Sequence, residues 1–585
     1  MPVSLVEDSS LLAANIGTST TRVILFDVVE GQYRFIAAGQ APSTVEAPYK
    51  DASLGVRWAI TSLQSITGRI FLDESRQLIT PIQSNGTGIE AFTVTMSAGP
   101  VLRAVVVGLL SDVSVESARK LAETSYLRVV ETFGLNDHRK PDEQIDAILR
   151  IRPDIIIMAG GTDGGASRSI QNVLEAVGLA CYLMPEEKRP AILFAGNQSL
   201  TETVKSSLNS LAATLHFSPN IRPSLDTEDL APASHELSQV VMDVRKRQVG
   251  GLAELDTWSN GHTFPTAFTV GRMLRFLSKM SGASRGILSV EIGSTASVVA
   301  AGFNGKLTLG VYPQFGLGDG LPGLLQYSKI EDILLWSPME VAPTTVRDYL
   351  YQQTLHPGTI PATKEDQAIA YCVSRQALFL AVQEASRNFP SAAKYIKGGL
   401  LPVFEPILAG GGALSDAPSP GQSLLLLLDA LQPVGITSVI LDQNKLLPML
   451  GAAADLNRLL PVQVLESGAF MSLGTVVSAI GAASYGTPLV RVRLTYQDGS
   501  DARAEVKFGE IEMLPLGVGQ VARLTVQPLH RADIGNGPGR TAAVQVTGGV
   551  MGVVIDARGR PLNLPSDPGR RRELLKKWQW TVGGS

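Results

Sequence analysis

Apolar and polar positions near the start of the chain predict a β-hairpin. Leu11–Ile16 is apolar except for Asn15, Gly17 interrupts the run, and a second apolar run follows at Val23–Phe26. Two such runs joined by a glycine turn are typical of a hairpin. Four hydroxyl residues lie between the two runs: Thr18, Ser19, Thr20 and Thr21. The backbone N–H groups and hydroxyls of such a turn can hold a phosphate, although an ordinary polar hairpin explains the same pattern.

The same layout occurs a second time at Ile287–Phe303, with Glu291 where the first copy has Asn15. The glycine and hydroxyl positions of this second turn are Gly293, Ser294 and Thr295. Each copy is followed by a later apolar run that ends in glycines, at 155–165 and at 406–416. Matching segments in the same order predict two related halves with a cleft between them.

Between the two copies, apolar runs alternate with amphipathic stretches. The expected strands are Glu90–Ser97, Val101–Val107, Ile155–Met158 and Pro190–Ala195. The expected helices are Trp58–Thr67, a segment from Ser114 to about Ser125, Glu143–Arg150, Ser167–Val177 and Ser199–Leu211. This alternation favours an α/β fold in which helices cover a sheet. The turn after one strand supplies candidate cleft residues, Gly160, Gly161, Thr162 and Asp163, although an aspartate also suits a turn without further function.

The second half continues the alternation. Helices are expected at Glu365–Asn388, Leu424–Leu431, Leu446–Leu460 and Ala469–Ala483, and strands at Pro402–Leu408 and Ile436–Leu441. Residues 318–323 match GxGxxG, but no clear strand precedes them and Pro322 lies inside the match. We interpret this segment as a loop near the cleft rather than a dinucleotide fingerprint.

The pattern changes after Pro488. Short alternating runs separated by glycine and proline turns predict a small β-sandwich or barrel at 488–562. A basic helical turn with Trp578 and Trp580 ends the chain, and it suits docking on its own domain or contact with a partner or membrane surface. The expected division is a leader at 1–10, two related α/β domains at 11–280 and 281–487, and a β-rich domain at 488–585 that includes the terminal helix turn.

Composition narrows the function classes. A chain of 585 residues is too long to fold around a single hydrophobic core. Its net charge of −4 shows no excess of basic residues, which argues against nucleic-acid binding. Cys181 and Cys372 form no CxxC and are expected to be buried, which fits a reducing cytoplasm. No signal peptide or transmembrane segment is expected, and the six histidines show no metal-ligand spacing. No GxSxG motif precedes a helix, which argues against a serine hydrolase.

These motifs resemble the actin/Hsp70/sugar-kinase ATPase superfamily. More narrowly, the chain resembles the MutL/GlmL family, an accessory to adenosylcobalamin-dependent glutamate mutase, over roughly residues 10–485. The segments that carry the resemblance are NIGTSTTR followed by ILFD, then VVVGLLSDVSVESARKLAE, DIIIMAGGTDGG, ILFAGN and EIGST. DIIIMAGGTDGG is the most specific of them, and the β-rich end of the chain lies outside the resemblance.

The resemblance implies two RNase-H-like domains that clasp ATP and Mg²⁺ around a cleft. By position, Gly17–Thr21 contact the β- and γ-phosphates from one side, and Gly293, Ser294 and Thr295 contact them from the other. The residues implied to approach adenosine are Gly410, Gly411 and Gly412. Glycine suits such positions because no Cβ blocks the approach of the backbone to a nucleotide.

Two positions depart from the superfamily pattern, which has aspartate at the start of each hairpin. Asn15 carries no charge for Mg²⁺, a cation that favours carboxylates, and each of Asn15 and Glu291 is expected to reach the metal only through water. A charge pair at about 4 Å and intermediate dielectric is worth roughly 4 kcal/mol, so metal affinity is expected to fall. Glu291, the catalytic candidate, extends its carboxylate about 1.5 Å further than aspartate does. A displacement of this size can spoil the orientation of an attacking water, so we expect ATP hydrolysis to be slow or lost. If the protein is active, we expect a slow Mg²⁺-dependent ATPase.

We therefore expect a cytoplasmic, chaperone-like accessory protein that binds ATP or ADP with a weakened Mg²⁺ site. Its partner is a cobalamin-dependent mutase or another large enzyme. The alternative is a structural protein that self-assembles through the actin-like fold into a filament or scaffold. A small-molecule kinase ranks last, because Glu291 replaces the usual catalytic aspartate.

Overall fold

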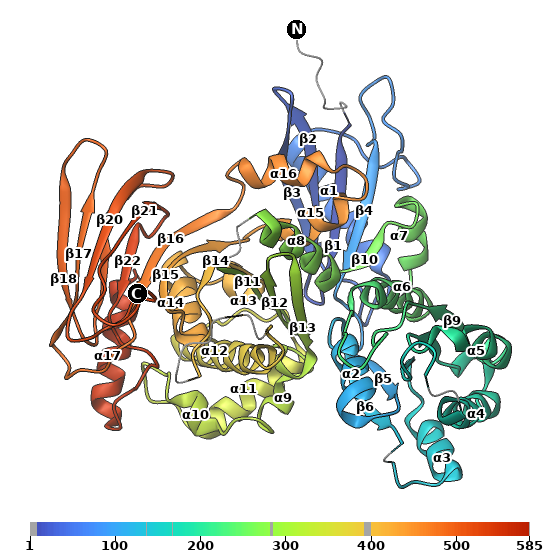
Figure 1. Cartoon of the computed structure of the whole chain (residues 1–585). Coiled ribbons are helices and arrows are strands. Elements are labelled where there is room, and N and C mark those ends of the chain that lie inside the picture. The colour runs from blue at the N-terminus through green and yellow to red at the C-terminus, as the bar shows by residue number, and fades with distance from the viewer. Residues whose placement is uncertain are drawn as a thin grey trace. The chain divides into compact units, whose positions relative to one another are not determined.

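Residue contacts divide the chain into two units (Figure 1). The first comprises Met1–Val270, Gly310–Pro313 and Pro448–Leu459, and the second comprises Gly271–Leu309, Gln314–Leu447 and Leu460–Ser585. The computed structural model describes residues 9–135, 137–165, 168–280, 285–390, 393 and 399–583. Most of the expected leader, residues 1–8, lies outside the described residues, as does Ser167 at the start of one expected helix.

The first sheet of the first unit has the strand order β3-β2-β1-β4-β10. Its strands are β1 (Leu11–Ile16), β2 (Thr20–Val29), β3 (Gln32–Pro42), β4 (Ala91–Met96) and β10 (Thr263–Pro265). β1 is antiparallel to β2, which confirms the predicted hairpin, and it is parallel to β4. β4 is in turn parallel to β10. The carboxyl ends of β1, β4 and β10 therefore lie at one edge of this sheet.

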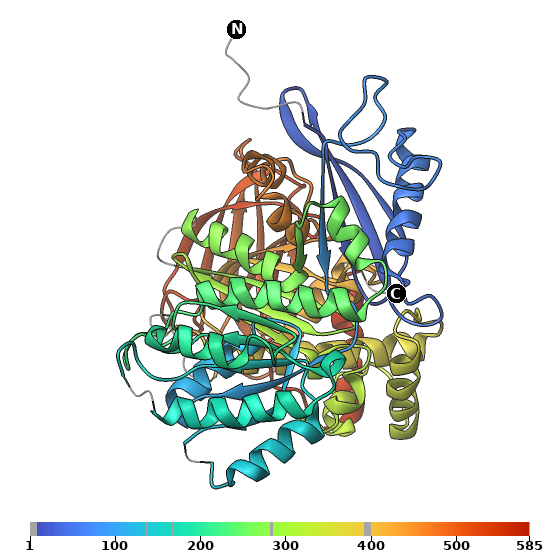
Figure 2. The same ribbon diagram turned by 90° about the vertical axis from the view of Figure 1, so that its right-hand side faces the viewer.

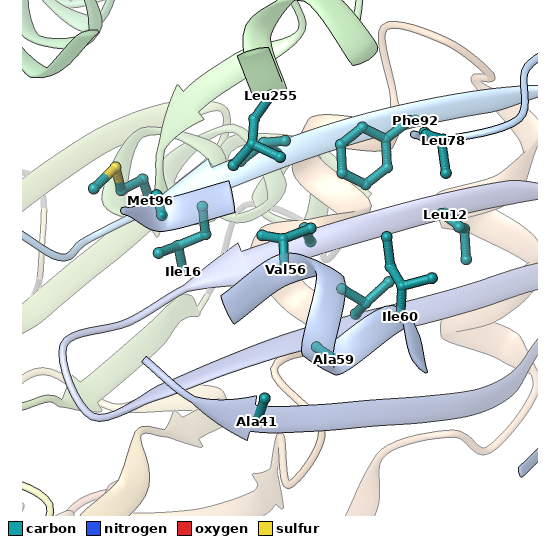
Figure 3. Close-up of a cluster of buried hydrophobic side chains, with 14 of the residues drawn as sticks. Leu12, Ile16, Ala41, Val56, Ala59, Ile60, Leu78, Phe92, Met96 and Leu255 are labelled. Carbon is teal, nitrogen blue, oxygen red and sulfur yellow. The ribbon is translucent and has the colours of Figure 1, made fainter. Parts of the chain in front are cut away.

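Helix α1 (Ala52–Thr67) covers one face of this sheet (Figure 2). Its Val56 and Ile60 pack with Leu12 and Ile16 of β1 in one buried cluster (Figure 3). Full burial of each such side chain contributes about 1.5–3 kcal/mol. Because side chains alternate along a strand, Asn15 points away from this cluster, to the other face of the sheet. The core thus fixes the orientation of the candidate site residue.

A second sheet in the first unit is wholly parallel, with the order β6-β5-β7-β8-β9. Its strands are β5 (Leu102–Val107), β6 (Leu127–Phe133), β7 (Ile155–Met158), β8 (Ala191–Phe194) and β9 (Thr214–Phe217). The helices around it are η1 (Ser111–Val115, a π-helix), α2 (Glu116–Ala122), α3 (Pro141–Ile151), α4 (Arg168–Leu183), η2 (Glu186–Lys188), η3 (Gln198–Leu200), α5 (Thr201–Leu208) and α6 (Ala231–Gln248). One buried cluster packs α2 and α6 on one face, and another packs α3, α4 and α5 on the other. The predicted α/β alternation is confirmed in this sheet.

The second unit contains an eight-stranded sheet with the order β13-β12-β11-β14-β15-β16-β22-β19. Its strands are β11 (Gly286–Ile292), β12 (Ser297–Phe303), β13 (Lys306–Tyr312), β14 (Phe404–Gly410), β15 (Gly435–Leu441), β16 (Met471–Ser478), β19 (Ile511–Leu514) and β22 (Val553–Asp556). β11 is antiparallel to β12 and parallel to β14, and β14 is parallel to β15. Counted in chain order, β13-β12-β11-β14-β15 repeats the order of the first unit's β3-β2-β1-β4-β10.

The remaining helices are divided between the two units. They are α7 (Leu252–Trp258), α8 (Thr266–Met280), η4 (Pro313–Phe315), α9 (Leu321–Leu324), α10 (Ile330–Leu334), α11 (Pro343–Leu355), α12 (Lys364–Ser386), α13 (Gly412–Ser415), α14 (Pro420–Leu431), α15 (Leu446–Ala453), α16 (Leu459–Glu466) and α17 (Pro568–Thr581). The expected helix at Leu446–Leu460 is therefore two helices, because the chain turns between Ala453 and Leu459.

The prediction of a helix at Ala469–Ala483 is wrong, because this segment contains strand β16. Val476 and Val477 are both buried, on opposite faces of the sheet. A strand covered on both faces lacks polar alternation, so its small apolar residues give no period that distinguishes it from a helix.

The C-terminal segment adds a four-stranded sheet with the order β18-β17-β20-β21. Its strands are β17 (Pro488–Thr495), β18 (Asp501–Lys507), β20 (Val521–Pro528) and β21 (Ala542–Thr547). β22 and β19 instead pair into the eight-stranded sheet through β16, and one apolar cluster joins the two sheets. Trp578 of α17 is buried and donates its indole N–H to the Gly509 carbonyl at 2.8 Å, so this helix docks within its own unit.

A buried network of charged side chains ties the C-terminal segment to the helices of the second unit. The Arg558 guanidinium donates to the Asp429 carboxylate of α14 at 2.6 Å and to Asp556 at 2.8 Å. Arg560 donates to Asp556 at 2.6 Å, and the Tyr371 hydroxyl of α12 donates to Asp429 at 2.7 Å. Burial alone raises the pKa of Asp556, but the two arginines hold that pKa well below its ordinary value.

Candidate functional site

The two hairpin turns have the same backbone geometry. In the first unit, Ile16 pairs with Thr21, and the Gly17 N–H donates to the Thr20 carbonyl at 3.1 Å. In the second unit, Ile292 pairs with Ser297, and the Gly293 N–H donates to the Ala296 carbonyl at 3.1 Å. The repeated sequence pattern thus corresponds to a repeated local structure, which places Thr18 and Ser19 in one turn and Ser294 and Thr295 in the other.

Asn15 has an unused hydrogen-bond acceptor. The residue is 2 % exposed, and its Oδ1 atom has no hydrogen-bond partner among the described residues. Asn15 lies beside Thr95 in the parallel register of β1 and β4, next to the edge where both strands end. The hydroxyl of Thr266, which follows β10 at the same edge, is also buried without a partner in the described part of the chain. Unpaired buried polar atoms are costly, so their presence points to a ligand or water at this edge.

Arg245 is a functional candidate that sequence reasoning missed. It is 2 % exposed, and within the described ranges both of its terminal guanidinium nitrogens lack a hydrogen-bond partner. Burial lowers its pKa to about 10, against the opposing effect of Asp154. A Cβ on Gly99 would lie 2.7 Å from Nη1, so the guanidinium lies directly against the loop after β4.

That loop connects Arg245 to the hairpin. The N–H groups of Ser97 and Ala98 donate to the carbonyl of Ile16, the residue that precedes the hairpin glycine. The first unit therefore gathers an unpaired buried cation and an unpaired buried amide oxygen around the end of β1. A positive charge of this kind favours an anion.

Glu291 lies near the carboxyl end of β11, level with Gly410 in the parallel register of β14. Burial raises the pKa of its carboxyl group, and the Lys445 ammonium opposes that shift. The Asp442 carboxylate accepts hydrogen bonds from the N–H groups of Leu446 at 2.8 Å and Leu447 at 2.7 Å, at the start of α15. Glu291 and Lys445 are charged side chains at this edge that the α15 cap does not use.

The glycine turn after β14 packs tightly against the hairpin strand. Gly411 has φ +93°, and a Cβ there would lie 2.2 Å from the Ile292 carbonyl oxygen. Only glycine fits that position, for a reason of backbone packing. Gly410 is more open, since its nearest neighbour would be Asp442 at 3.9 Å, and Gly412 begins α13.

The formal GxGxxG segment also lies against the second hairpin. The N–H groups of Leu317 and Gly318 donate to the carbonyls of Gly293 and Ser294. A Cβ on Gly316 would lie 2.6 Å from the Ser294 carbonyl oxygen. These glycines allow close packing on the hairpin turn. Residues 316–320 form a loop, as interpreted, whereas Leu321–Gly323 lie in the short helix α9.

Residues 160–163 belong to a different part of the first unit from the hairpin. They follow β7 of the parallel sheet, whereas Asn15 lies in β1 of the other sheet and Gly17 follows that strand. The Asp163 carboxylate accepts from the Gln198 N–H at 3.1 Å and from the Asn220 amide at 3.0 Å, so it holds neighbouring loops in place.

Other chemical candidates are few. Among the described residues, no group of three histidine, cysteine or carboxylate side chains could hold a metal ion. Cys181 and Cys372 are both buried, as predicted, and burial raises the pKa of Cys181 to about 11. None of the helices in the described ranges is long and apolar enough to cross a bilayer.

A model of the MutL protein family matches residues 11–468. The chain therefore belongs to the MutL family, as its motifs indicated. Its fold is mixed α/β with parallel strands. Protein MutL of Clostridium tetanomorphum is 25 % identical over 206 residues, which are 35 % of this chain and 42 % of that protein. The match spans less than half the length of this relative.

Three solved structures align with much of the chain. Acetone carboxylase without nucleotide has 12 % identity and a TM-score of 0.30, over 86 % of this chain and 81 % of that one. An ATP-dependent caprolactamase from Pseudomonas jessenii has 11 % identity and a TM-score of 0.32, over 85 % of this chain and 81 % of that one. Component A of the Acidaminococcus fermentans (R)-2-hydroxyglutaryl-CoA dehydratase has 10 % identity and a TM-score of 0.23, over 76 % of this chain and 96 % of that one. Scores of this size support no conclusion about what the chain binds.

Proposed function

We propose that the chain is an ATP-binding protein of the actin-like type, in which both hairpin turns contact the phosphates of one nucleotide. The observation that carries this proposal is the repeated hairpin. Both copies have the same pairing register and the same turn hydrogen bond, and each lies among five strands of the same order. The glycine turn at 410–412 is the proposed adenosine contact, because it follows the strand next to β11.

We propose further that Mg²⁺ contributes less than in an ordinary member of the fold. Asn15 offers one neutral oxygen, which suits a water molecule on the metal better than the metal itself. Arg245 supplies a buried positive charge on the same side, and it can offset phosphate charge that a metal otherwise neutralises. Glu291 would orient an attacking water if hydrolysis occurs, but its raised pKa leaves less of the ionised form that this role needs. Slow or absent hydrolysis is the expected result.

Membership of the MutL family supports an accessory role toward an adenosylcobalamin-dependent mutase. In this proposal, nucleotide binding changes the arrangement of the two halves and so changes the surface that the partner contacts. Self-assembly through the actin-like fold is the alternative.

Thermal unfolding with and without nucleotide tests the binding proposal. ATP at about a hundred times its dissociation constant should stabilise the chain by about 2.7 kcal/mol. ATP should stabilise nearly as well in EDTA as with Mg²⁺, because Arg245 and the turns carry most of the phosphate contact. An unchanged melting temperature with both ATP and ADP would contradict nucleotide binding.

Pull-down separates the two roles. Tagged protein should retain the purified mutase in a manner that depends on ATP, while light scattering of the protein alone stays constant. Growth of large particles on addition of ATP, without retention of the mutase, would favour self-assembly instead.

A further inference from the structure

The parallel sheet of the first unit has a strand order with a recognised ligand position. Numbered in chain order from β5, the order β6-β5-β7-β8-β9 is 2-1-3-4-5, with α2 and α6 on one face and α3, α4 and α5 on the other. In such doubly wound sheets, ligands bind outside the carboxyl ends of the strands where the connections diverge. Here that switch point lies between β5 and β7.

The two loops at this point are in contact. A Cβ on Gly160, which has φ +141°, would lie 2.9 Å from the Leu109 side chain. The loop after β5 leads directly into the π-helix Ser111–Val115, and π-helical turns are frequent at functional sites. The Ser114 hydroxyl accepts from the N–H groups of Leu109 and Leu110, which fixes this loop.

The loop after β7 presents unused donors. Among the described residues, the N–H groups of Gly161 and Thr162, both partly exposed, donate to no acceptor, whereas Gly160 is buried against Gly196. The amides that follow are satisfied, since Asp163 donates to the Pro223 carbonyl and Gly164 to the Asn197 side chain. Two consecutive free amides at a switch point suit the oxygens of an anion.

Apolar and acidic residues lie on the loops at the same edge of the sheet. Leu110 and Leu135, from the loops after β5 and β6, are 44 % and 50 % exposed, and the Leu135 N–H donates to the Leu109 carbonyl. Asp112 and Asp163 place carboxylates at the same edge, where they can accept from hydroxyl groups. Ligand sites typically combine apolar walls with a few such polar groups.

We propose that the switch point between β5 and β7 is a second binding site, separate from the hairpins, for a phosphorylated, hydroxyl-bearing ring compound. The phosphate accepts from the amides of Gly161 and Thr162 and from the exposed Ser111 hydroxyl. The ring lies against Leu110 and Leu135, and the ligand hydroxyls donate to the carboxylates.

Titration of the full chain with two probes, flavin mononucleotide and AMP, tests this site. Saturating ATP is kept present so that the proposed actin-like site is filled. At least one probe should bind, and its dephosphorylated counterpart, riboflavin or adenosine, should bind at least about tenfold more weakly. Failure of both phosphorylated probes to bind would overturn the proposal.

A matched pair of variants locates the binding. Ser111→Asp adds a negative charge at a helix start, where it favours folding but repels a phosphate, and Ser111→Asn is its neutral counterpart. Ser111→Asp should weaken the probe at least about tenfold relative to Ser111→Asn, with equal or higher thermal stability. Equal affinities in the two variants would place the probe elsewhere and overturn the assignment.

Discussion

Asn15 is the residue at which the proposed nucleotide site differs most from an efficient ATPase. Its buried Oδ1 atom has no partner in the described part of the chain, and the position calls for a carboxylate in the superfamily that the chain resembles. The sequence alone identified this substitution. Arg245 could not be found in that way, because nothing in the sequence around this arginine indicates that folding will bury it against the loop at Gly99.

Asn15→Asp tests the metal argument. The change is isosteric and adds a charge that Mg²⁺ prefers, so Mg²⁺-dependent ATP affinity should rise by about tenfold or more, or about 1.4 kcal/mol. Without metal the variant should be less stable than the wild type, since a buried carboxylate lacks a partner. Calorimetric titration with ATP in Mg²⁺ and in EDTA measures both effects. No gain in Mg²⁺ dependence would remove Asn15 from the metal site.

Glu291→Gln tests the environment of the catalytic candidate. Burial raises the pKa of Glu291 above its ordinary value of 4.5, so the folded chain binds this proton more tightly than the unfolded chain does. The wild type therefore loses stability as pH rises from about 4.5 through the raised pKa, whereas glutamine stays neutral. The variant should match the wild type near about pH 4 and exceed its unfolding free energy at about pH 8. A difference that is the same at both pH values would contradict this account.

At the scale of elements, strong local patterns predicted structure well. The hairpins, the parallel strands and the long helix α12 follow from apolar periodicity and turn residues. Strand β16 was missed because burial on both faces removed its alternation, and the pairing of β22 with β16 depends on contacts distant in sequence. The buried network around Asp429 and Arg558 was invisible for the same reason.

Gly411→Ala tests the packing of the glycine turn on β11. The added Cβ would meet the Ile292 carbonyl and would force alanine into φ +93°, so the variant should lose more than about 1–3 kcal/mol of stability. Gly323→Ala is the matched control, because a Cβ there meets nothing within 4 Å. Chemical denaturation compares the two, and equal midpoints would show that the turn can relax.

Asp429→Asn tests the network that ties the C-terminal segment to α12 and α14. Removal of one charge leaves Arg558 buried with a weaker partner and should cost about 3–5 kcal/mol. Asp501→Asn, in the exposed cluster with Arg493 and Arg503, should cost much less, because water already solvates these charges. Denaturation of the full chain measures both, and a small loss in Asp429→Asn would mean that the network sets geometry rather than stability.

At the scale of the whole molecule, the duplication was visible in the sequence because each half keeps its glycine and hydroxyl turn. The strand order 2-1-3-4-5 of the inserted parallel sheet was not, because pairing order depends on contacts that no local pattern records. The chain therefore combines repeated hairpin-bearing sheets with a doubly wound sheet, and we propose a different ligand position for each kind of sheet.

ATP titration of the full chain and of paired hairpin variants tests the central claim most directly. Ser19→Asp and Ser294→Asp each place a negative charge in one hairpin turn, and Ser19→Asn and Ser294→Asn are their neutral controls. If both turns hold the phosphates, each aspartate variant should bind ATP at least about tenfold more weakly than its asparagine control. Absence of ATP binding by the wild type, or unchanged affinity in either aspartate variant, would contradict the account.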